Sequence, residues 1–201
     1  KATNSKWIAL LDSDDEWLPN KLEKQIKILK SNPKYSFCHT NEVWIRNGVL
    51  LNQMKKHQKY GGEIFFKVLD MCRISPSSTL FHRSILDQVG YFDEDFLICE
   101  DYDLWIRISA EFQILFLDEF LIKKYGGHND QLSKVSDGIE RYRIEVLERL
   151  INKNFSNDQL SAIRSELIKK LKIFSIGAKK RQKPIEFKNA LKRIDELSIA
   201  V

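Results

Sequence analysis

The stretch LLDSDDEW, residues 10–17, places three carboxylates within four positions directly after an apolar run. Side chains of a strand alternate between its two faces, so Asp12 and Asp14 are expected to point the same way at the end of this segment. A hard cation such as Mg²⁺ or Mn²⁺, which prefers carboxylate and phosphate oxygens, would relieve the repulsion between the charges. Asp12, Asp14 and Asp15 therefore predict a site for a divalent metal and phosphate.

Three other interpretations of this acidic cluster were open. A calcium loop of the EF-hand type, counted from Asp12, needs Gly at its sixth position, where Trp17 stands, and Pro19 would break it even though Glu23 falls at position twelve. A phosphatase nucleophile in an Asp-x-Asp pair also follows a strand, but the Thr and the Gly-rich context expected after it are missing. Aspartates that cap a helix before Pro19 are the third alternative.

Two further stretches contain residues able to do chemistry. In FLICEDYDLWIRIS, an apolar run delivers Glu100 and Asp101 to the start of a helix, where a carboxylate is either a cap, favoured by the helix dipole, or a general base. In KKYGGHNDQLS, Gly126 and Gly127 allow a tight turn before His128. A lone His is usually structural, but one in a Gly-rich polar loop after a strand can also contact a diphosphate or a metal.

Hydrophobic patterning predicts the elements that position these residues. The run KWIALL is typical of a buried parallel strand, and the spacing of Leu22, Ile26 and Leu29 predicts a helix that ends at Asn32-Pro33. YSFCHTNEVWI, SPSSTLFHR and ILFLDEFLIKKY predict strands, with RNG as a hairpin turn. Helices are expected in EIFFKVLDM, before Gly90 and in EDYDLWIRISAEF.

The sequence changes character near residue 135. Three amphipathic helices are predicted beyond it, near 138–153, 157–173 and 184–198, and each would expose an apolar stripe if isolated. We therefore expect them to pack on the rest of the chain. The stripe residues are Leu147, Leu150, Leu160, Ile163, Leu167, Leu171, Leu191 and Ile194. The predicted organisation is a first unit over 1–136 and a helical extension over 137–201.

The composition of the 201 residues, 43% hydrophobic and 30% charged, is that of a globular protein, and no apolar run approaches the length of about 18 that spans a bilayer. No secretory signal is recognisable, so a cytoplasmic location is expected. Cys38, Cys72 and Cys99 lack C-x-x-C spacing and are interpreted as buried, reduced thiols. The net charge of +5 concentrates in the basic last third, which allows contact with anionic lipid or nucleic acid, although a solvated basic face is preferred.

The stretches LLDSDDEWLPNKLEKQI, GYFDEDFLICEDYDLWIRIS and GGHNDQLS, in this order and spacing, resemble the family-2 inverting glycosyltransferases of GT-A fold over residues 1 to about 136. The resemblance implies an α/β fold: the C-terminal part of a GT-A, Rossmann-like mixed sheet with flanking helices, followed by an α-helical tail. The family's first strands, which usually hold the nucleotide base, have no counterpart here. An N-terminally truncated domain is therefore expected.

In that family the Asp-x-Asp region binds a divalent metal and the nucleotide-sugar. Carried over to this sequence, Asp14 is the expected Mn²⁺ or Mg²⁺ ligand, Asp12 a ribose or metal contact and Asp15 a second candidate ligand. The family's His-containing loop maps to His128, expected beside the diphosphate and as a further metal ligand. Gln131 follows it as an expected donor contact.

The family's Glu-Asp motif supplies the catalytic base, which maps to Asp101 with Glu100 beside it. On a helix beginning near Glu100, Asp101 and Trp105 share a face, so an inward Trp105 would bring Asp101 towards the cleft, whereas Asp103 would point elsewhere. The implied reaction is a direct displacement at the anomeric carbon by an acceptor hydroxyl, with inversion, by a hexosyltransferase-type enzyme.

The implied partners are a nucleotide-sugar donor and a glycan or lipid-linked acceptor of polysaccharide biosynthesis, with no nucleic acid. The basic helices of the tail would also allow peripheral contact with an anionic membrane at its cytoplasmic face. The main rival is a non-catalytic fragment that binds a carbohydrate or a partner protein. A truncated sheet could keep an acceptor-binding face while it loses the donor site and, with it, the activity.

Overall fold

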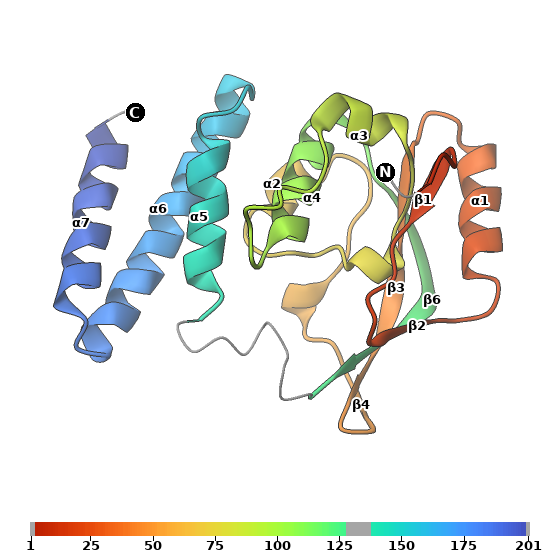
Figure 1. The fold of residues 1–201 in the computed structure, drawn as a ribbon, viewed down its shortest axis with the longest axis horizontal. Coiled ribbons are helices and arrows are strands. Elements are labelled where there is room, and N and C mark those ends of the chain that lie inside the picture. The colour runs from red at the N-terminus through yellow and green to blue at the C-terminus, as the bar shows by residue number, and fades with distance from the viewer. Residues whose placement is uncertain (1–2, 128–137, 200–201) are drawn as a thin grey trace.

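The computed structural model of the protein describes residues 3–127 and 138–199. A mixed sheet with the helix Lys21–Ser31 on its outer side lies at one end of the molecule, the helices of residues 140–199 lie at the other, and the remaining helices lie between them (Figure 1). Within the described ranges the sheet has six strands in the order β1-β5-β3-β6-β2, with β4 paired to β3 off this path. The strands are β1 (Trp7–Ala9), β2 (Asp15–Trp17), β3 (Phe37–Arg46), β4 (Val49–Leu51), β5 (Leu80–His82) and β6 (Leu115–Gly126).

The helices follow the predicted places. Those that lie among the strands are α1 (Lys21–Ser31), α2 (Phe65–Val68), α3 (Ser84–Val89) and α4 (Glu100–Glu111), with short 3-10 turns at Lys55–His57 and Pro76–Ser78. The last three are α5 (Glu140–Leu150), α6 (Asn157–Lys180) and α7 (Pro184–Ile199). No helix in the described part of the chain is both long and apolar enough to cross a membrane.

The sheet is built on the long pair β3 and β6, which run parallel to each other. The other strand pairs are antiparallel, and they include β1, where Ile8 lies opposite Phe81 of β5. The prediction of a buried parallel strand over residues 6–11 is therefore wrong, because β1 is half-buried and runs antiparallel to its neighbour. An apolar run indicates a strand but contains no information about its pairing direction.

The predicted hairpin at RNG is confirmed. Asn47 and Gly48 both have positive φ, 50° and 77°, which is the conformation of a tight turn whose twist matches the flanking strands. Arg46 then lies opposite Val49, and β4 returns along β3 for three residues. The end of this hairpin projects beyond the other strands, at the bottom of Figure 1.

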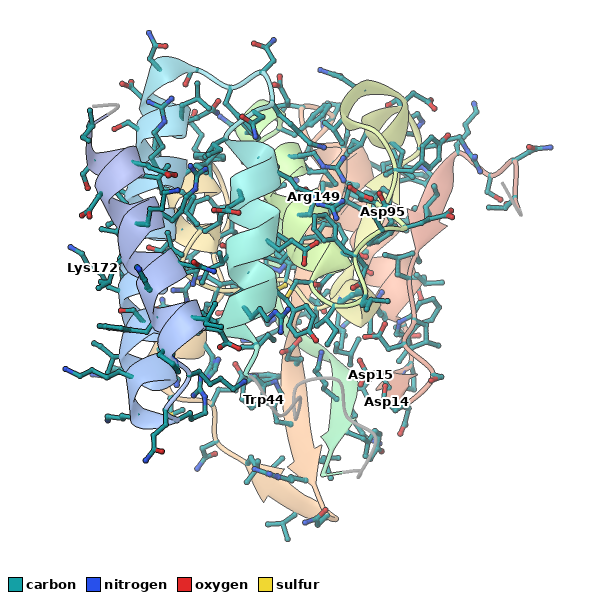
Figure 2. The ribbon with its side chains drawn as sticks, turned by 60° about the vertical axis from the view of Figure 1, so that its left-hand side comes forward. Asp14, Asp15, Trp44, Asp95, Arg149 and Lys172 are labelled. Atoms are coloured by element: carbon teal, nitrogen blue, oxygen red, sulfur yellow. The ribbon has the colours of Figure 1, made fainter. Side chains whose placement is uncertain are left out.

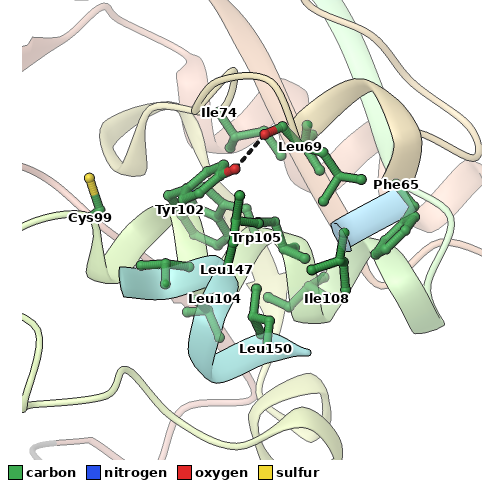
Figure 3. Close-up of a cluster of buried hydrophobic side chains, with 14 of the residues drawn as sticks. Phe65, Leu69, Ile74, Cys99, Tyr102, Leu104, Trp105, Ile108, Leu147 and Leu150 are labelled. Atoms are coloured by element: carbon green, nitrogen blue, oxygen red, sulfur yellow. Dashed lines mark hydrogen bonds between the residues drawn. The ribbon is translucent and has the colours of Figure 1, made fainter. Parts of the chain in front are cut away.

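Helix α4 passes through the centre of the molecule and is buried on all sides from Tyr102 to Ser109. Trp105 makes edge-on ring contacts with Phe37 of β3 and Phe81 of β5, so α4 packs directly on the sheet. The Tyr102 hydroxyl donates a hydrogen bond to the Leu69 carbonyl (Figure 3). These contacts fix both the rotation of α4 and the position of its first turn.

The predicted packing of the C-terminal helices on the core is confirmed. Leu147 and Leu150 of α5 are buried in the same apolar cluster as Trp105 (Figure 3). Ile163 and Leu167 of α6 belong to this cluster too. Arg149, labelled beside Asp95 in Figure 2, pairs with that carboxylate at 3.6 Å. The tail helices are thus anchored to the segment that precedes α4.

Two expected burial patterns are wrong. In α7, Leu191 is 41% exposed, because Ala190 and Leu197 are the residues that face inward. In α1, Leu22 is also exposed, and the helix buries Lys21 and Gln25 together with Leu29. Both polar side chains donate to backbone carbonyls next to β5: Lys21 Nζ donates to Thr79 O at 3.2 Å and Gln25 Nε2 to Ser78 O at 2.9 Å.

Candidate functional site

Three neighbouring strands bring the side chains of Trp44, Lys124 and Asp15 into one row. Lys124 of β6 is the paired residue of Trp44 on β3 and of Asp15 on β2. Directly paired residues of adjacent strands project from the same face of a sheet, so the three side chains share a face. Asp14 and Asp15 lie in the same lower region of the molecule as Trp44 (Figure 2).

The acidic cluster occupies a turn between β1 and β2. The Asp15 amide donates to the Asp12 carbonyl at 3.1 Å, so Asp12 and Asp14 are separated by a turn and not by one step of a strand. The predicted same-side spacing on a pleat is therefore wrong as a mechanism for bringing them together. The helix-capping alternative is wrong too, because the N-cap of α1 is Asn20, which makes no side-chain capping bond.

A buried loop of serines holds this turn in place. The Asp12 amide donates to Ser77 Oγ at 3.0 Å, and Trp17 Nε1 donates to the Ser77 carbonyl at 2.9 Å. Ser77 is fully buried, so the turn is attached to the interior of the protein. The strand predicted over SPSSTLFHR is thus shorter than expected, because Pro76–Ser78 form a 3-10 turn and only Leu80–His82 pair as β5.

Asp15 is the most enclosed carboxylate of the cluster. The Tyr125 amide donates to its Oδ1 at 3.3 Å, while Oδ2 is buried and, among the described residues, has no hydrogen-bond partner. Burial raises the pKa of the Asp15 carboxyl, and the charges of Asp12 and Asp14 add to this, whereas the nearby Ser77 hydroxyl and the charge of Lys124 oppose the rise. A buried acceptor oxygen without a donor is a suitable ligand for a cation.

Lys124 is a functional candidate that sequence reasoning missed. Its ammonium donates to Ser75 Oγ at 3.3 Å. Burial lowers the pKa of Lys124, but the carboxylates of Glu42, Asp15 and Asp12 outweigh burial and hold that pKa above its usual value. Its place in the predicted strand could have identified it, because Lys124 comes two residues after Ile122 and strand alternation puts both side chains on the same face. Ile122 is fully buried. Lys124 therefore stays charged within the acidic cluster.

The pair Glu100 and Asp101 begins α4, directly after Cys99, whose φ of 71° is unusual for a residue with a side chain. Asp101 Oδ1 accepts from the Tyr102 amide at 2.7 Å, and Oδ2 accepts from the Cys72 thiol at 3.1 Å. All three cysteines are free as expected, but only Cys38 and Cys99 are buried, and Cys72 is half-buried.

Electrostatics join the two acidic stretches. Burial raises the pKa of Asp101, and Asp12 raises it further, while the hydrogen bonds from Cys72 and Tyr102 and the charge of Lys124 oppose the rise. Burial also raises the pKa of Glu100, with further contributions from Asp101 and Asp12. The turn after β1 and the start of α4 are therefore close enough for the charge of Asp12 to act on both carboxyls.

Two expectations about α4 are confirmed. Trp105 is buried among aromatic rings on the face that it shares with Asp101. Asp103 points away from the site, because its carboxylate is fully buried and pairs with Arg107 Nη2 at 2.6 Å. Asp101 and Glu100 thus stay the two candidate bases at this helix start.

The remaining predicted metal and donor contacts, His128 and Gln131, lie outside the described residues. Within the ranges that are described, no group of three or more His, Cys, Asp or Glu side chains gathers as a metal site. Asp12, Asp14 and Asp15 offer only oxygen donors, a set that suits Mg²⁺ or Mn²⁺ when ligand phosphates complete the coordination. The metal site expected at these carboxylates therefore stays a prediction.

The chain is similar to several known proteins. Residues 1–90 match the model of glycosyl transferase family 2. The uncharacterized glycosyltransferase MJ1057 of Methanocaldococcus jannaschii is 33% identical over 144 residues, which are 67% of this chain and 48% of that protein. WfgD of Escherichia coli, a UDP-Glc:alpha-D-GlcNAc-diphosphoundecaprenol beta-1,3-glucosyltransferase, is 32% identical over 126 residues, 62% of this chain and 47% of that protein. The chain spans about half the length of these two curated relatives.

A solved structure gives the same fold. The crystal structure of S. aureus TarS 1-349 is similar to this chain with a TM-score of 0.63 at 17% sequence identity, over 98% of this chain and 59% of that one. The expected GT-A mixed sheet with flanking helices is thereby confirmed. The extent of the match shows that the similarity includes the C-terminal helices.

Proposed function

This chain belongs to glycosyl transferase family 2, and on that basis we propose that it transfers a sugar from a nucleotide-sugar to an acceptor hydroxyl with inversion. The observation that supports this reaction is the convergence of Asp12, Asp15, Asp101 and Lys124, which come from three separate parts of the sequence. A carboxylate with a raised pKa beside a charged lysine offers a base for the acceptor and a cation for a departing diphosphate.

In the proposed reaction, Asp101 takes the proton of the acceptor hydroxyl as that oxygen bonds to the anomeric carbon. The bond from this carbon to the donor diphosphate breaks on the opposite side, so the nucleoside diphosphate leaves and the configuration inverts. Lys124 stabilises the negative charge of the leaving group. A divalent cation held by Asp14 and Asp12, with Asp15 and His128 as further ligands, would add positive charge at the same place.

The relatives support a choice of substrates. WfgD and WfaP of Escherichia coli are described as UDP-glucose-dependent enzymes that act on GlcNAc-diphosphoundecaprenol. By analogy, the proposed donor is a UDP-hexose, the proposed acceptor is a glycan linked to a lipid diphosphate, and the proposed location is the cytoplasmic face of a membrane. The proposed organisation keeps the division into 1–136 for the transferase unit and 137–201 for the helical extension.

A donor screen tests the activity. The protein is incubated with UDP-, GDP- and dTDP-sugars and Mn²⁺, with and without a GlcNAc-diphosphate lipid, and release of the nucleoside diphosphate is measured. We expect release from a UDP-hexose that the acceptor stimulates. Binding of the glycan without binding or turnover of any donor would instead favour the non-catalytic carbohydrate-binding alternative.

The metal assignment predicts the behaviour of Asp14→Asn. Asp14 is exposed, so the change should leave the fold intact while it removes a charged oxygen ligand. We expect stimulation of turnover by Mn²⁺ to be lost, as measured by product formation across a Mn²⁺ titration. Asp195→Asn, which changes an exposed carboxylate of α7, is the matched control and should titrate like the wild type. Equal Mn²⁺ dependence in the two variants would contradict the assignment.

The Cys72 thiol predicts a shift in pH dependence. A hydrogen bond donated to the charged form of Asp101 lowers its pKa, so its removal in Cys72→Ala should raise that pKa further. A base must be deprotonated, so the acid limb of the kcat profile should move to higher pH. Cys72→Ser retains a donor and should restore the wild-type position of this limb. An unmoved acid limb in Cys72→Ala would show that the thiol does not act on the base.

A further inference from the structure

The hairpin of β3 and β4 presents an apolar surface that nothing in the described structure covers. Val49, Leu50, Leu51 and Met54, together called the hairpin patch, are 63%, 64%, 39% and 57% exposed. Because strand side chains alternate, Val49 and Leu51 lie on one face of β4 and Leu50 on the other. Both faces of this strand are therefore apolar and exposed, at the end of a hairpin that extends from the sheet (Figure 1).

The charges around the hairpin patch are all positive. Residues 43–62 contain no Asp or Glu, and Arg46, Lys55 and Lys56 are exposed. Lys59, the remaining lysine of residues 43–62, is buried, and its ammonium pairs with the Glu42 carboxylate at 3.0 Å. The exposed part of the hairpin thus combines the apolar side chains of the hairpin patch with the positive charges of Arg46, Lys55 and Lys56.

We propose that the hairpin patch inserts into the headgroup region of a membrane that contains anionic lipids. A protein partner that docked by strand or surface contact would cover one face of β4, whereas lipid surrounds a short hairpin on both faces. Apolar side chains flanked by lysine and arginine are the combination that binds anionic interfaces. Exposed apolar patches of this kind otherwise favour aggregation, particularly on a strand with a free edge.

The C-terminal helices are less suited to this contact. Several of their basic residues are neutralised by carboxylates of the same or neighbouring helices: Lys183 pairs with Glu186 at 3.3 Å, and Arg193 pairs with Glu148 at 2.8 Å. Residues 43–62, which contain Arg46, Lys55 and Lys56, have no Asp or Glu of their own. The proposed membrane contact is therefore the hairpin, and not the basic tail that was expected from the sequence.

The hairpin lies close to the candidate site, so a membrane contact there would affect the choice of acceptor, provided that the proposed function holds. Trp44, beside Lys124 in the site, precedes Arg46 by two residues of the same strand, a separation of roughly 7 Å. A membrane-inserted hairpin would hold the candidate site close to the bilayer surface, where the diphosphate of a lipid-linked acceptor lies. The acceptor class that fits this arrangement is anchored in the membrane, and a freely soluble glycan is not.

Vesicle binding tests the inference without any need for catalysis. The protein is sedimented with vesicles of phosphatidylcholine and phosphatidylglycerol, or of phosphatidylcholine alone, at increasing salt. We expect binding to the anionic vesicles that weakens with salt. Val49→Ser with Leu50→Ser should reduce partitioning about tenfold or more, and Lys55→Gln with Lys56→Gln about 30-fold. Leu97→Ser, at a residue 83% exposed outside the hairpin, is the control and should bind like the wild type.

Three results would overturn the inference: no binding to anionic vesicles, loss of binding in Lys179→Gln with Lys180→Gln but not in the hairpin variants, or equal binding by all variants. Light scattering measures the oligomeric state in the same variants. If the wild type is a dimer and Val49→Ser with Leu50→Ser is a monomer, the hairpin patch binds a second copy of the chain and not lipid. The substituted side chains are exposed, so unchanged circular dichroism and Tm should accompany the effect. Failure of the donor screen leaves these results unaffected, which separates the two proposals.

Discussion

Replacing Asp101 with asparagine is expected to lower kcat for sugar transfer by about 10²–10⁴-fold, the usual contribution of a general base. Asparagine has the same size, and its carbonyl can still accept from the Tyr102 amide, so the start of α4 should be retained. It cannot accept a proton from the acceptor hydroxyl. Initial rates at saturating donor and acceptor measure the effect, and donor affinity should stay near the wild-type value.

Glu100→Gln is the matched variant for this test. Glu100 is the neighbouring residue and its pKa is also raised by burial, but the Cys72 thiol and the charge of Lys124 act on Asp101. We therefore expect a milder loss in Glu100→Gln. Near-normal transfer by Asp101→Asn together with an inactive Glu100→Gln would identify Glu100 as the base.

Replacing Arg107 with leucine is expected to destabilise the protein by about 3–5 kcal/mol, the usual effect of removing one partner from a buried ion pair. Asp103 is fully buried, and its Oδ2 accepts from Arg107 Nε at 2.9 Å and from Nη2 at 2.6 Å. The same guanidinium donates to the Val89 and Tyr91 carbonyls at 2.6 and 2.9 Å. Leucine leaves a buried charge and two carbonyls without these donors.

For a protein of this size, the loss corresponds to a Tm lower by roughly 6–20 °C, measured by circular dichroism. Lys192→Leu removes a pair on α7 in which the lysine side chain is 78% exposed, and it should change Tm little. Leucine at both 103 and 107 should recover part of the lost stability, because no buried charge is left unpaired. A Tm of Arg107→Leu equal to that of the control would contradict the assigned role of the ion pair.

The sequence alone determined the local features of this fold. Apolar spacing predicted α4, and the last three helices were expected from their stripes because a helix must bury such a stripe. The RNG turn was predicted correctly because a tight hairpin needs residues that tolerate positive φ, such as Asn47 and Gly48. The carboxylates of the candidate site were also identifiable, since acidic residues directly after apolar runs have few structural explanations.

Only the tertiary structure decided how these parts combine. The direction of β1 depends on β5, which is about 70 residues away in the sequence, and a strand's own pattern is the same for either direction. Ser77 holds the turn at Asp12 in place. Lys124 stays charged because of carboxylates on β3, on β2 and in the turn before β2. Leu22 is exposed because Lys21 and Gln25 find buried carbonyls to bond. Each of these outcomes depends on contacts between distant segments, and the free energy of such contacts has no counterpart in the local pattern.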